Sequence, residues 1–273
     1  MTTVTPIKNI LIPYDGSPQS KNALQYAIVL TKLVSGQLTI LKSYNVAMET
    51  TTADATTGIY PIALTEFKEI TEDELSELNA EFKELNDIPY KTISSPGVLI
   101  TAIELYTEDN PIDVIIMGTH GASGWEEFLG GSTTANMVGN TDSTPLWVVP
   151  YDVKSYETPK RIAIAVDPDN IPAAEKLTFL DEVSTLFSAE VSVVYVADKK
   201  KGSIDSFAES IDKNAEVYWL QGDIDDALLD FSINNDIDIL FAVHKDRNFF
   251  ASLFHSSVAK KIVSHTSIPV VVL

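Results

Sequence analysis

The sequence predicts an α/β protein made of two tandem, open, doubly wound parallel sheets of the Rossmann-like kind. Short apolar segments are separated by helical patterns, which is typical of a parallel sheet covered by helices on both faces. The pattern also occurs twice. KNILIPYD at 8–15 reappears as KRIAIAVD at 160–167, and IDVIIM at 112–117 reappears as IDILFA at 237–242. Right-handed crossovers then make each half a doubly wound domain.

A third repeated segment supports a division of the chain into two domains. GSTTANMV at 131–138 reappears as SSVAKKIV at 256–263, and each leads to an apolar strand that begins with proline. The polar stretch PYDVKSYETP between the repeats is typical of a linker. We therefore expect a first domain over residues 1–150 and a second over residues 151–273, each close to the usual domain length of about 150 residues.

The elements of the first repeat follow from apolar spacing and from end signals. Ser17 is a natural helix N-cap with Pro18 at the first helical position, and Gly36 can end that helix. An irregular Thr- and Ala-rich stretch then precedes an acidic amphipathic helix. The expected strands are 10–14, 38–44, 88–94, 112–117 and 145–149, the irregular stretch is 45–63, and the later helices are 64–86, 98–109 and 132–140.

The second repeat shows the same order of elements. Its expected strands are 161–166, 190–196, 216–221, 237–243 and 269–273, and its expected helices are 172–187, 203–212, 223–234 and 256–264.

Composition and charge exclude several function classes. The chain has 19 basic and 39 acidic residues, a formal net charge of −20, so we expect neither a nucleic-acid nor an anionic-membrane partner. It has no cysteine, which excludes disulfides and thiol catalysis. No apolar run approaches the roughly 18 residues of a membrane span, and the start leaves no room for a signal peptide. We therefore expect a cytoplasmic protein.

Two segments of the first repeat lie where a doubly wound sheet binds ligands, at the carboxyl ends of its strands. The first is Pro13-Tyr14-Asp15-Gly16-Ser17. The second is a glycine-rich loop that runs from Gly118 to a helix start at Ser132. Glycine N–H groups and a helix N-terminus can together bind a polyphosphate, even on an acidic protein. The alternative is that these glycines serve only tight turns and a helix cap.

The residues of this second segment carry a resemblance to a known family. The spacing Gly118-x2-Gly121-x9-Gly131-Ser132 follows a DVIIM strand and precedes a Pro-led strand, and it resembles the universal stress protein family. The opening ILIPYDGSPQSKNALQYA is similar to that family too. The resemblance covers nearly all of both repeats except 45–90 and 197–215. It implies a tandem-domain member with the adenine nucleotide α-hydrolase-like fold.

On the base side, the resemblance implies four nucleotide-binding residues. Pro13, Tyr14 and Asp15 match the positions that hold adenine and ribose at the end of the first strand. Ser43 matches a position on the second strand that lines the adenine pocket. That position is often Val in the family, so Ser43 departs from the pattern.

On the phosphate side, the resemblance implies six more. Met117 and Gly118 end the fourth strand beneath the nucleotide. The residues that contact the phosphates are Gly121, Gly131, Ser132 and Thr133. The basic residue that often follows Gly121 in the family is Ala122 here. The implied ligand is ATP, which usually brings Mg²⁺.

The second repeat lacks the glycine motif. The counterparts of Gly118, Gly121, Gly131 and Ser132 are Val243, Asp246, Ser256 and Ser257. We therefore interpret residues 151–273 as a degenerate domain without a triphosphate site.

Three functions stay open at this point. The first is a regulatory protein of the stress response that senses ATP through its N-terminal domain. The second is a slow ATPase or an enzyme that transfers adenylate or phosphate, although no catalytic residue and no metal-ligand spacing is predicted. The third is an interaction module that binds no nucleotide. The resemblance also implies that 145–149 and 269–273 pair within one chain as an intrachain pseudo-dimer, and it leaves a homodimer open.

Overall fold

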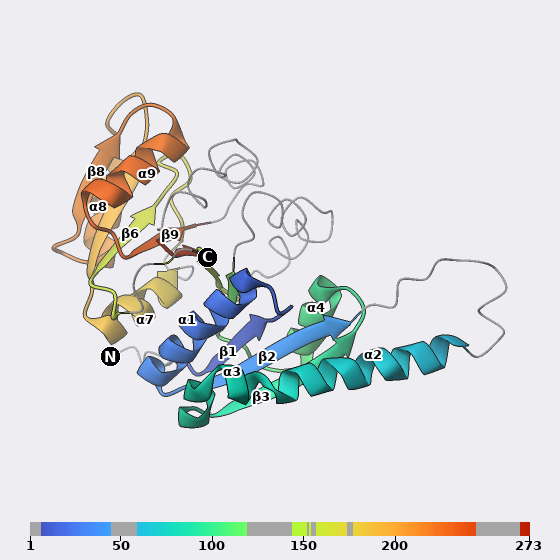
Figure 1. Cartoon of the computed structure of the whole chain (residues 1–273). Helices are drawn as coiled ribbons and strands as arrows, with labels where there is room; N and C mark the ends of the chain where they lie inside the picture. The colour runs from blue at the N-terminus through green and yellow to red at the C-terminus, as the bar shows by residue number, and fades with distance from the viewer. Residues whose placement is uncertain are drawn as a thin grey trace. The chain divides into compact units, whose positions relative to one another are not determined.

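The computed structural model describes residues 7–44, 59–118, 144–151, 153, 157–173, 177–243 and 268–273, with backbone alone for 59–64 and 225. The chain forms two compact units. The first unit is Lys8–Ile116, and the second is Met117–Leu273 together with Met1–Ile7. Each unit is an α/β layer structure built on a sheet (Figure 1). The expected division at residue 150 stays a prediction.

The first unit is built on a parallel sheet in the order β3-β2-β1-β4. The strands are β1 (Asn9–Pro13), β2 (Gln37–Tyr44), β3 (Tyr90–Pro96) and β4 (Val114–Gly118), which continues two residues past the end of this unit. The helices are α1 (Pro18–Val34), α2 (Ile59–Ser76), α3 (Leu78–Glu81), the 3₁₀ turn η2 (Lys83–Asp87) and α4 (Leu99–Asp109). The order reverses at β1, since the chain moves outward to β3 and then returns to β4.

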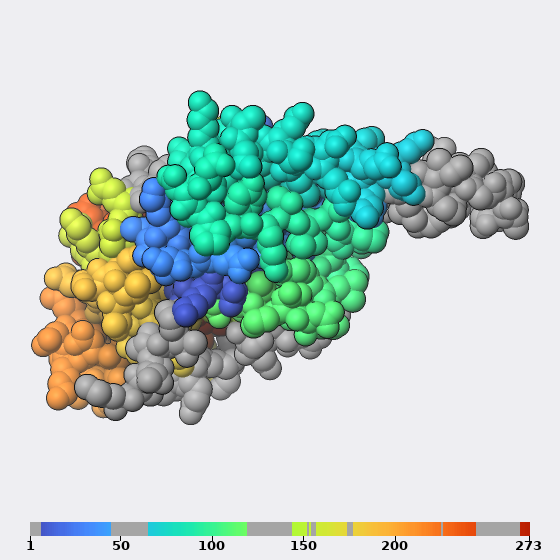
Figure 2. All heavy atoms as spheres, turned by 90° about the horizontal axis from the view of Figure 1, so that it is seen from below, coloured from blue at the N-terminus to red at the C-terminus, as the bar shows by residue number. Residues whose placement is uncertain are grey.

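Helices cover both faces of this sheet. Helices α1, α2 and α3 lie on one face and α4 lies on the other (Figure 1). Figure 2 shows α2 and α3 as a continuous cyan-to-teal band over the surface of the unit. The central strand β1 is buried between the two layers, with Ile10, Leu11 and Ile12 each 0% exposed.

The second unit contains strands in the order β5-β10-β9-β6-β7-β8. They are β5 (Leu146–Val149), β6 (Arg161–Ala165), β7 (Glu190–Val196), β8 (Glu216–Leu220), β9 (Ile239–Ala242) and β10 (Val270–Val272). Its described helices are α7 (Thr178–Phe187), α8 (Ser203–Ile211) and α9 (Ile224–Asn234). All its strand pairs are parallel except β5–β10, which is antiparallel with Val271 opposite Trp147. The expected pairing of these two strands within one chain is confirmed.

The α/β fold class is confirmed, and all ten expected strands are present to within two residues at each end. Two helix predictions were wrong. The helix expected at 64–86 starts earlier, at Ile59, and is broken into α2, α3 and η2. The first break is at Glu77, and the second is at Phe82, which leaves the helical conformation at φ −112° and ψ 83°. The helix expected at 172–187 begins only at Thr178. The helices expected at 132–140 and 256–264 lie outside the described residues.

One carboxylate in each unit joins the starts of two neighbouring strands. Asp113 Oδ2 accepts hydrogen bonds from the backbone N–H groups of Lys8 (2.8 Å) and Asn9 (2.7 Å). Asp238 Oδ2 accepts them from Lys160 (2.7 Å) and Arg161 (2.9 Å). These aspartates occupy matching positions in the repeated segments IDVIIM and IDILFA. The sequence repeat is thus reproduced as a repeated atomic contact.

The end of α1 corrects one detail of the sequence reading. Ser35, rather than Gly36, adopts the left-handed conformation, with φ 52° and ψ 42°. Gly36 is needed for a different reason. A Cβ on it would lie 2.8 Å from the backbone oxygen of Lys8 and 3.0 Å from Val34 Cγ2. Because Gly36 has no Cβ, its backbone can lie close to Lys8 O. The next residue, Gln37, then donates its N–H to Lys8 O at 2.6 Å, and β2 begins there beside β1.

We expect Gly36→Ala to lower the free energy of unfolding by about 1–3 kcal/mol, the usual cost of overpacking. Gly202→Ala is the matched control, because nothing lies within 4 Å of a Cβ there and φ is −67°. Urea denaturation of both variants measures the difference. Equal stability of the two variants would show that the contact with Lys8 O is not tight.

Candidate functional site

Six of the ten predicted nucleotide-binding residues are described, and all six lie at the carboxyl ends of β1, β2 and β4. Pro13 ends β1, and Tyr14 continues it with a backbone N–H that donates to Leu41 O at 2.8 Å. The other described members are Asp15, Ser43, Met117 and Gly118. The phosphate-side residues Gly121, Gly131, Ser132 and Thr133 lie outside the described residues. Their role stays a prediction.

The register of the sheet decides which of these side chains share a face. Cα partners in neighbouring parallel strands lie on the same face, and so do alternate residues along one strand. Pro13 is paired with Leu41, and Ser43 follows Leu41 by two residues. Thr39 precedes Leu41 by two residues, so Thr39 and its partner Lys91 lie on the same face as Leu41. Lys91 Nζ lies 5.3 Å from the centre of the Tyr106 ring on α4, which identifies this face as the one that α4 covers. Pro13 and Ser43 therefore lie on the α4 face.

Met117 and Gly118 end β4 at the same edge. β4 is paired with β1 through Ile10–Val114 and Leu11–Ile115. Met117 follows Ile115 by two residues and therefore shares its face of the strand. Gly118, the first glycine of the motif, is the last residue of β4.

Tyr14 belongs to the opposite face. It follows Ile12, whose partner Ile40 precedes Lys42 by two residues, and Lys42 Nζ forms an ion pair with Glu74 of α2. The Tyr14 side chain is 6% exposed and packs on the side of α2 and α3. Tyr14 and Ser43 are thus both at the predicted site, but their side chains lie on different faces of the sheet.

Burial raises the pKa of the Tyr14 phenol from 10.0 to about 12, and the carboxylates of Glu81, Asp15 and Glu74 add to this rise. The phenol is consequently neutral at physiological pH. Tyr14 can donate a hydrogen bond but does not act as a base.

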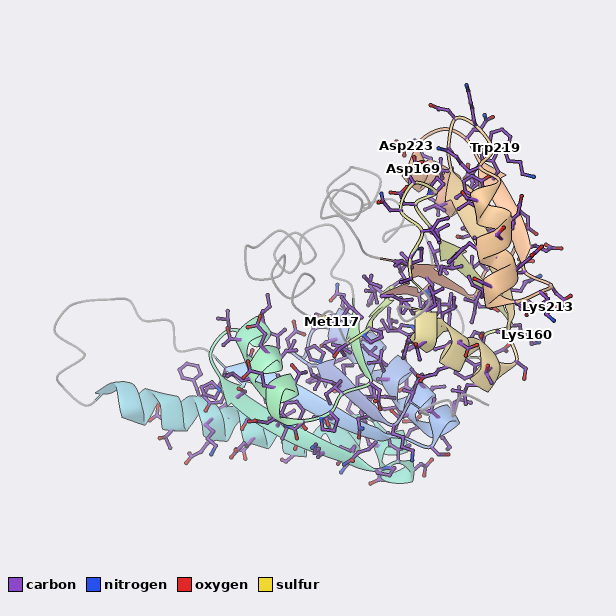
Figure 3. All side chains as sticks on the ribbon, turned by 180° about the vertical axis from the view of Figure 1, so that it is seen from behind. Met117, Lys160, Asp169, Lys213, Trp219 and Asp223 are labelled. Carbon is purple, nitrogen blue, oxygen red and sulfur yellow. The ribbon has the colours of Figure 1, made fainter. Side chains whose placement is uncertain are left out.

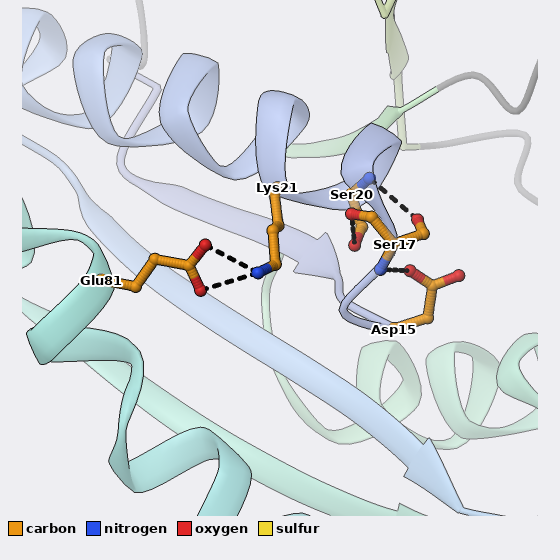
Figure 4. A network of polar contacts seen from close by, with 5 residues as sticks. All are labelled: Asp15, Ser17, Ser20, Lys21 and Glu81. Carbon is orange, nitrogen blue, oxygen red and sulfur yellow. Dashed lines mark hydrogen bonds and ion pairs between the residues drawn. The ribbon is translucent and has the colours of Figure 1, made fainter.

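Asp15 shapes the turn that leads from β1 into α1. Its Oδ1 accepts a hydrogen bond from the Ser17 N–H at 2.9 Å, and Ser17 Oγ in turn accepts from the Ser20 N–H at 3.1 Å as the helix N-cap (Figure 4). The predicted cap at Ser17 is confirmed. One turn further, Lys21 Nζ contacts both carboxylate oxygens of Glu81 at 2.7 and 2.9 Å, which ties α1 to α3. The Asp15 carboxylate is exposed at the edge of the sheet.

Sequence reasoning missed one residue at this edge. Ser95 is the Cα partner of Ser43 and shares its half-buried position on the α4 face. Only the register of β2 with β3 brings these two hydroxyls together. The strand at 88–94 was expected, but its register could not be read from the sequence.

The same turn recurs in the second unit with different neighbours. Asp167 Oδ1 accepts from the Asp169 N–H at 2.9 Å, and its Oδ2 accepts from Asn170 Nδ2 at 2.7 Å. Lys201 Nζ then contacts Asp169 Oδ1 at 2.8 Å, a hydrogen bond that raises the pKa of Lys201. Lys201 therefore places a positive charge beside the acidic turn that contains Asp167 and Asp169.

Two hydrogen bonds fix the segment after β7, residues 197–201, at this edge of the sheet. Tyr195 Oη accepts from the Lys201 N–H at 3.0 Å, and Trp219 Nε1 donates to Ala197 O at 2.8 Å. Figure 3 shows Asp169, Trp219 and Asp223 at one end of the second unit and Lys160 and Lys213 at the other. The carboxyl edge of this unit carries both acidic and basic side chains and is partly covered by its own chain.

Two other features are absent from the part of the chain that the structure describes. No helix in these ranges is long and apolar enough to cross a membrane. The described Asp and Glu side chains form no group of three that could hold a metal ion, and the four histidines lie outside the described residues.

We expect the Tyr14 phenol to titrate near pH 12. The absorbance difference between wild type and Tyr14→Phe isolates this one tyrosinate. The folded-state pKa lies above the unfolded value of 10.0, so the contribution of Tyr14 to stability is complete below pH 10 and is lost as the pH rises toward 12. A midpoint near 10 for this phenol would contradict the packing described here.

Comparison with known proteins agrees with this arrangement. The family model "Universal stress protein family" matches residues 6–150. Universal stress protein MJ0577 of Methanocaldococcus jannaschii is 34% identical over 82 residues, which is 29% of this chain and 50% of that protein. The chain thus matches half the length of this curated relative.

Two solved structures share the fold over nearly the whole chain. A universal stress protein from Archaeoglobus fulgidus has a TM-score of 0.69 at 20% identity, covering 97% of this chain and 95% of that chain. The functionally unknown protein PA1789 from Pseudomonas aeruginosa has a TM-score of 0.60 at 14% identity, covering 100% and 94%. With the family model matching more than half of its residues, the chain belongs to the universal stress protein family.

Proposed function

We propose that this protein is an ATP-binding universal stress protein that acts as a cytoplasmic, nucleotide-sensing regulator of the stress response. ATP is held by the N-terminal domain, residues 1–150, at the carboxyl edge of β1, β2 and β4. The observation that carries the proposal is that β4 ends on Gly118, the first glycine of a complete motif, while β1 ends on Pro13 at the same edge of the sheet.

The residues at this edge suit the parts of a nucleotide. The exposed Asp15 carboxylate can accept hydrogen bonds from ribose hydroxyls, as it accepts one from the Ser17 N–H. Ser43 offers a half-buried surface for the base on the α4 face, and Pro13 lies on the same face but is buried. The Tyr14 ring is buried toward α2 and its N–H donates to Leu41 O, so Tyr14 contributes through its backbone carbonyl. The phosphates are bound by neutral N–H and hydroxyl groups of the glycine loop. When bound with the triphosphate, Mg²⁺ would balance part of its charge.

The second domain, residues 151–273, keeps the fold without a triphosphate site. Val243 stands at its counterpart of Gly118, and Lys201 forms an ion pair with Asp169 in the turn that follows β6. Its final strand pairs with the final strand of the first domain, and we propose that this makes the chain an intrachain pseudo-dimer.

Asp15→Ala is expected to weaken ATP binding by about 10- to 100-fold, because it removes charged hydrogen bonds worth about 1.5–3 kcal/mol. Asp167→Ala is the matched control, since Asp167 forms the same turn in the second unit. Isothermal titration with MgATP compares the two variants with wild type. Equal weakening by both variants, or none by Asp15→Ala, would contradict the assignment.

A regulatory role also predicts that purified protein carries adenine nucleotide and hydrolyses it near the background rate. Denaturing the purified protein and identifying the released small molecules by mass spectrometry tests the first point. ATP turnover at ordinary enzyme rates, about 1–1000 per second, would instead support an enzyme. Absence of binding at millimolar ATP would support an interaction module.

A further inference from the structure

The carboxyl edge of β2 and β3 carries a pair of neighbouring hydroxyls that the packing of the sheet does not require. Ser43 and Ser95 are Cα partners, and strands paired in this way lie about 5 Å apart. The pair just inside it on the same face is Leu41 and Ile93, and both are apolar. On the α4 face the paired residues thus run from Thr39 and Lys91, through the apolar pair Leu41 and Ile93, to two serines at the edge.

The second unit shows which residues the fold places here in the repeat that lacks the glycine motif. The register of β6 with β7 matches that of β1 with β2, so Val196 corresponds to Ser43. Its Cα partner Leu220 corresponds to Ser95. Gly97 follows Ser95 by two residues, and Gly222 follows Leu220 by two residues. Their φ angles, 101° and 103°, are nearly equal, which supports the correspondence of Ser95 with Leu220.

Val196 and Leu220 both pack against the hydrophobic core of the second unit. An aliphatic pair is therefore compatible with this position of the fold. Of the two sequence repeats, the one with the complete glycine motif has the hydroxyl pair, and the other has Val196 and Leu220.

The two hydroxyls are also not used within the described residues. Ser94, their neighbour on the opposite face, donates to Glu72 Oε1 at 3.0 Å. By contrast, no hydrogen bond between described residues involves the side chain of Ser43 or Ser95. Both are half-buried, so a ligand that covers them must offer hydrogen-bonding groups or leave them unsatisfied.

We propose that Ser43 and Ser95 form a base-reading pair that hydrogen-bonds the polar edge of a purine. The inference rests on the proposed nucleotide site and specifies its ligand class. Each hydroxyl can both donate and accept. The pair can therefore meet the amino group and ring nitrogen of adenine or the oxygen and N–H of guanine. The site consequently takes both purine nucleoside triphosphates and rejects a purine that lacks a substituent at position 6.

The test compares three ligands by isothermal titration: ATP, GTP and purine riboside 5′-triphosphate, which has hydrogen at position 6. Wild type is expected to bind ATP and GTP within about fivefold of each other and the riboside at least about tenfold more weakly. The double variant Ser43→Val, Ser95→Val introduces aliphatic residues like those of the second unit. It is expected to bind ATP and the riboside equally.

Ser94→Ala is the matched control, because Ser94 is adjacent on β3 but faces α2. It is expected to keep the wild-type ratio between ATP and the riboside. An unchanged ratio in the double variant, with ATP still bound, would overturn the base-reading pair alone. Failure of wild type to bind any of the three ligands would overturn the nucleotide site itself.

Discussion

A single carboxylate in each unit sets how the first and fourth strands of the repeat lie against each other. Asp113 and Asp238 each accept two backbone N–H groups at the start of the first strand. Hydrogen bonds to a charged group are stronger than those between neutral groups, and they require a fixed position of the acceptor. The register fixed at this end carries through to the other end of the strands. There, Pro13 and Gly118 meet the same edge, which is the edge at which a doubly wound sheet binds ligands.

The two units therefore share a frame and differ at its edge. In the first repeat, the acidic turn at Asp15 is followed by a glycine motif, and two serines are paired at the carboxyl ends of β2 and β3. In the second, Lys201 compensates the acidic turn, and an aliphatic pair replaces the serines. Duplication explains the shared contacts, such as the turns at Asp15 and Asp167. The differences at the edge are consistent with one nucleotide-binding domain and one that has kept only the fold.

The sequence was sufficient for the central strands, such as β1, β4, β6 and β9, because each is a short apolar run that is buried whatever its register. It was insufficient where the structure depends on whether a helix is continuous or on which residues of two strands are paired. Leu75, Leu78, Phe82 and Leu85 were expected on one helix. All four are buried, but the chain breaks at Phe82 and reaches the sheet through shorter turns. Ser95 could not be found without the register of β3. Likewise, the alternation of side chains along each strand places Tyr14 and Ser43 on opposite faces of the sheet, although the resemblance had placed both on the base side of the nucleotide.

The central claim is that nucleotide binds at the carboxyl edge of the first unit and not of the second. Hydrogen exchange with and without MgATP, resolved to short peptides, tests it most directly. The account predicts slower exchange of backbone amides at 14–17 and around Gly118, with no change at the corresponding turn, 166–170. Protection confined to 166–170, or no protection at saturating MgATP, would contradict it.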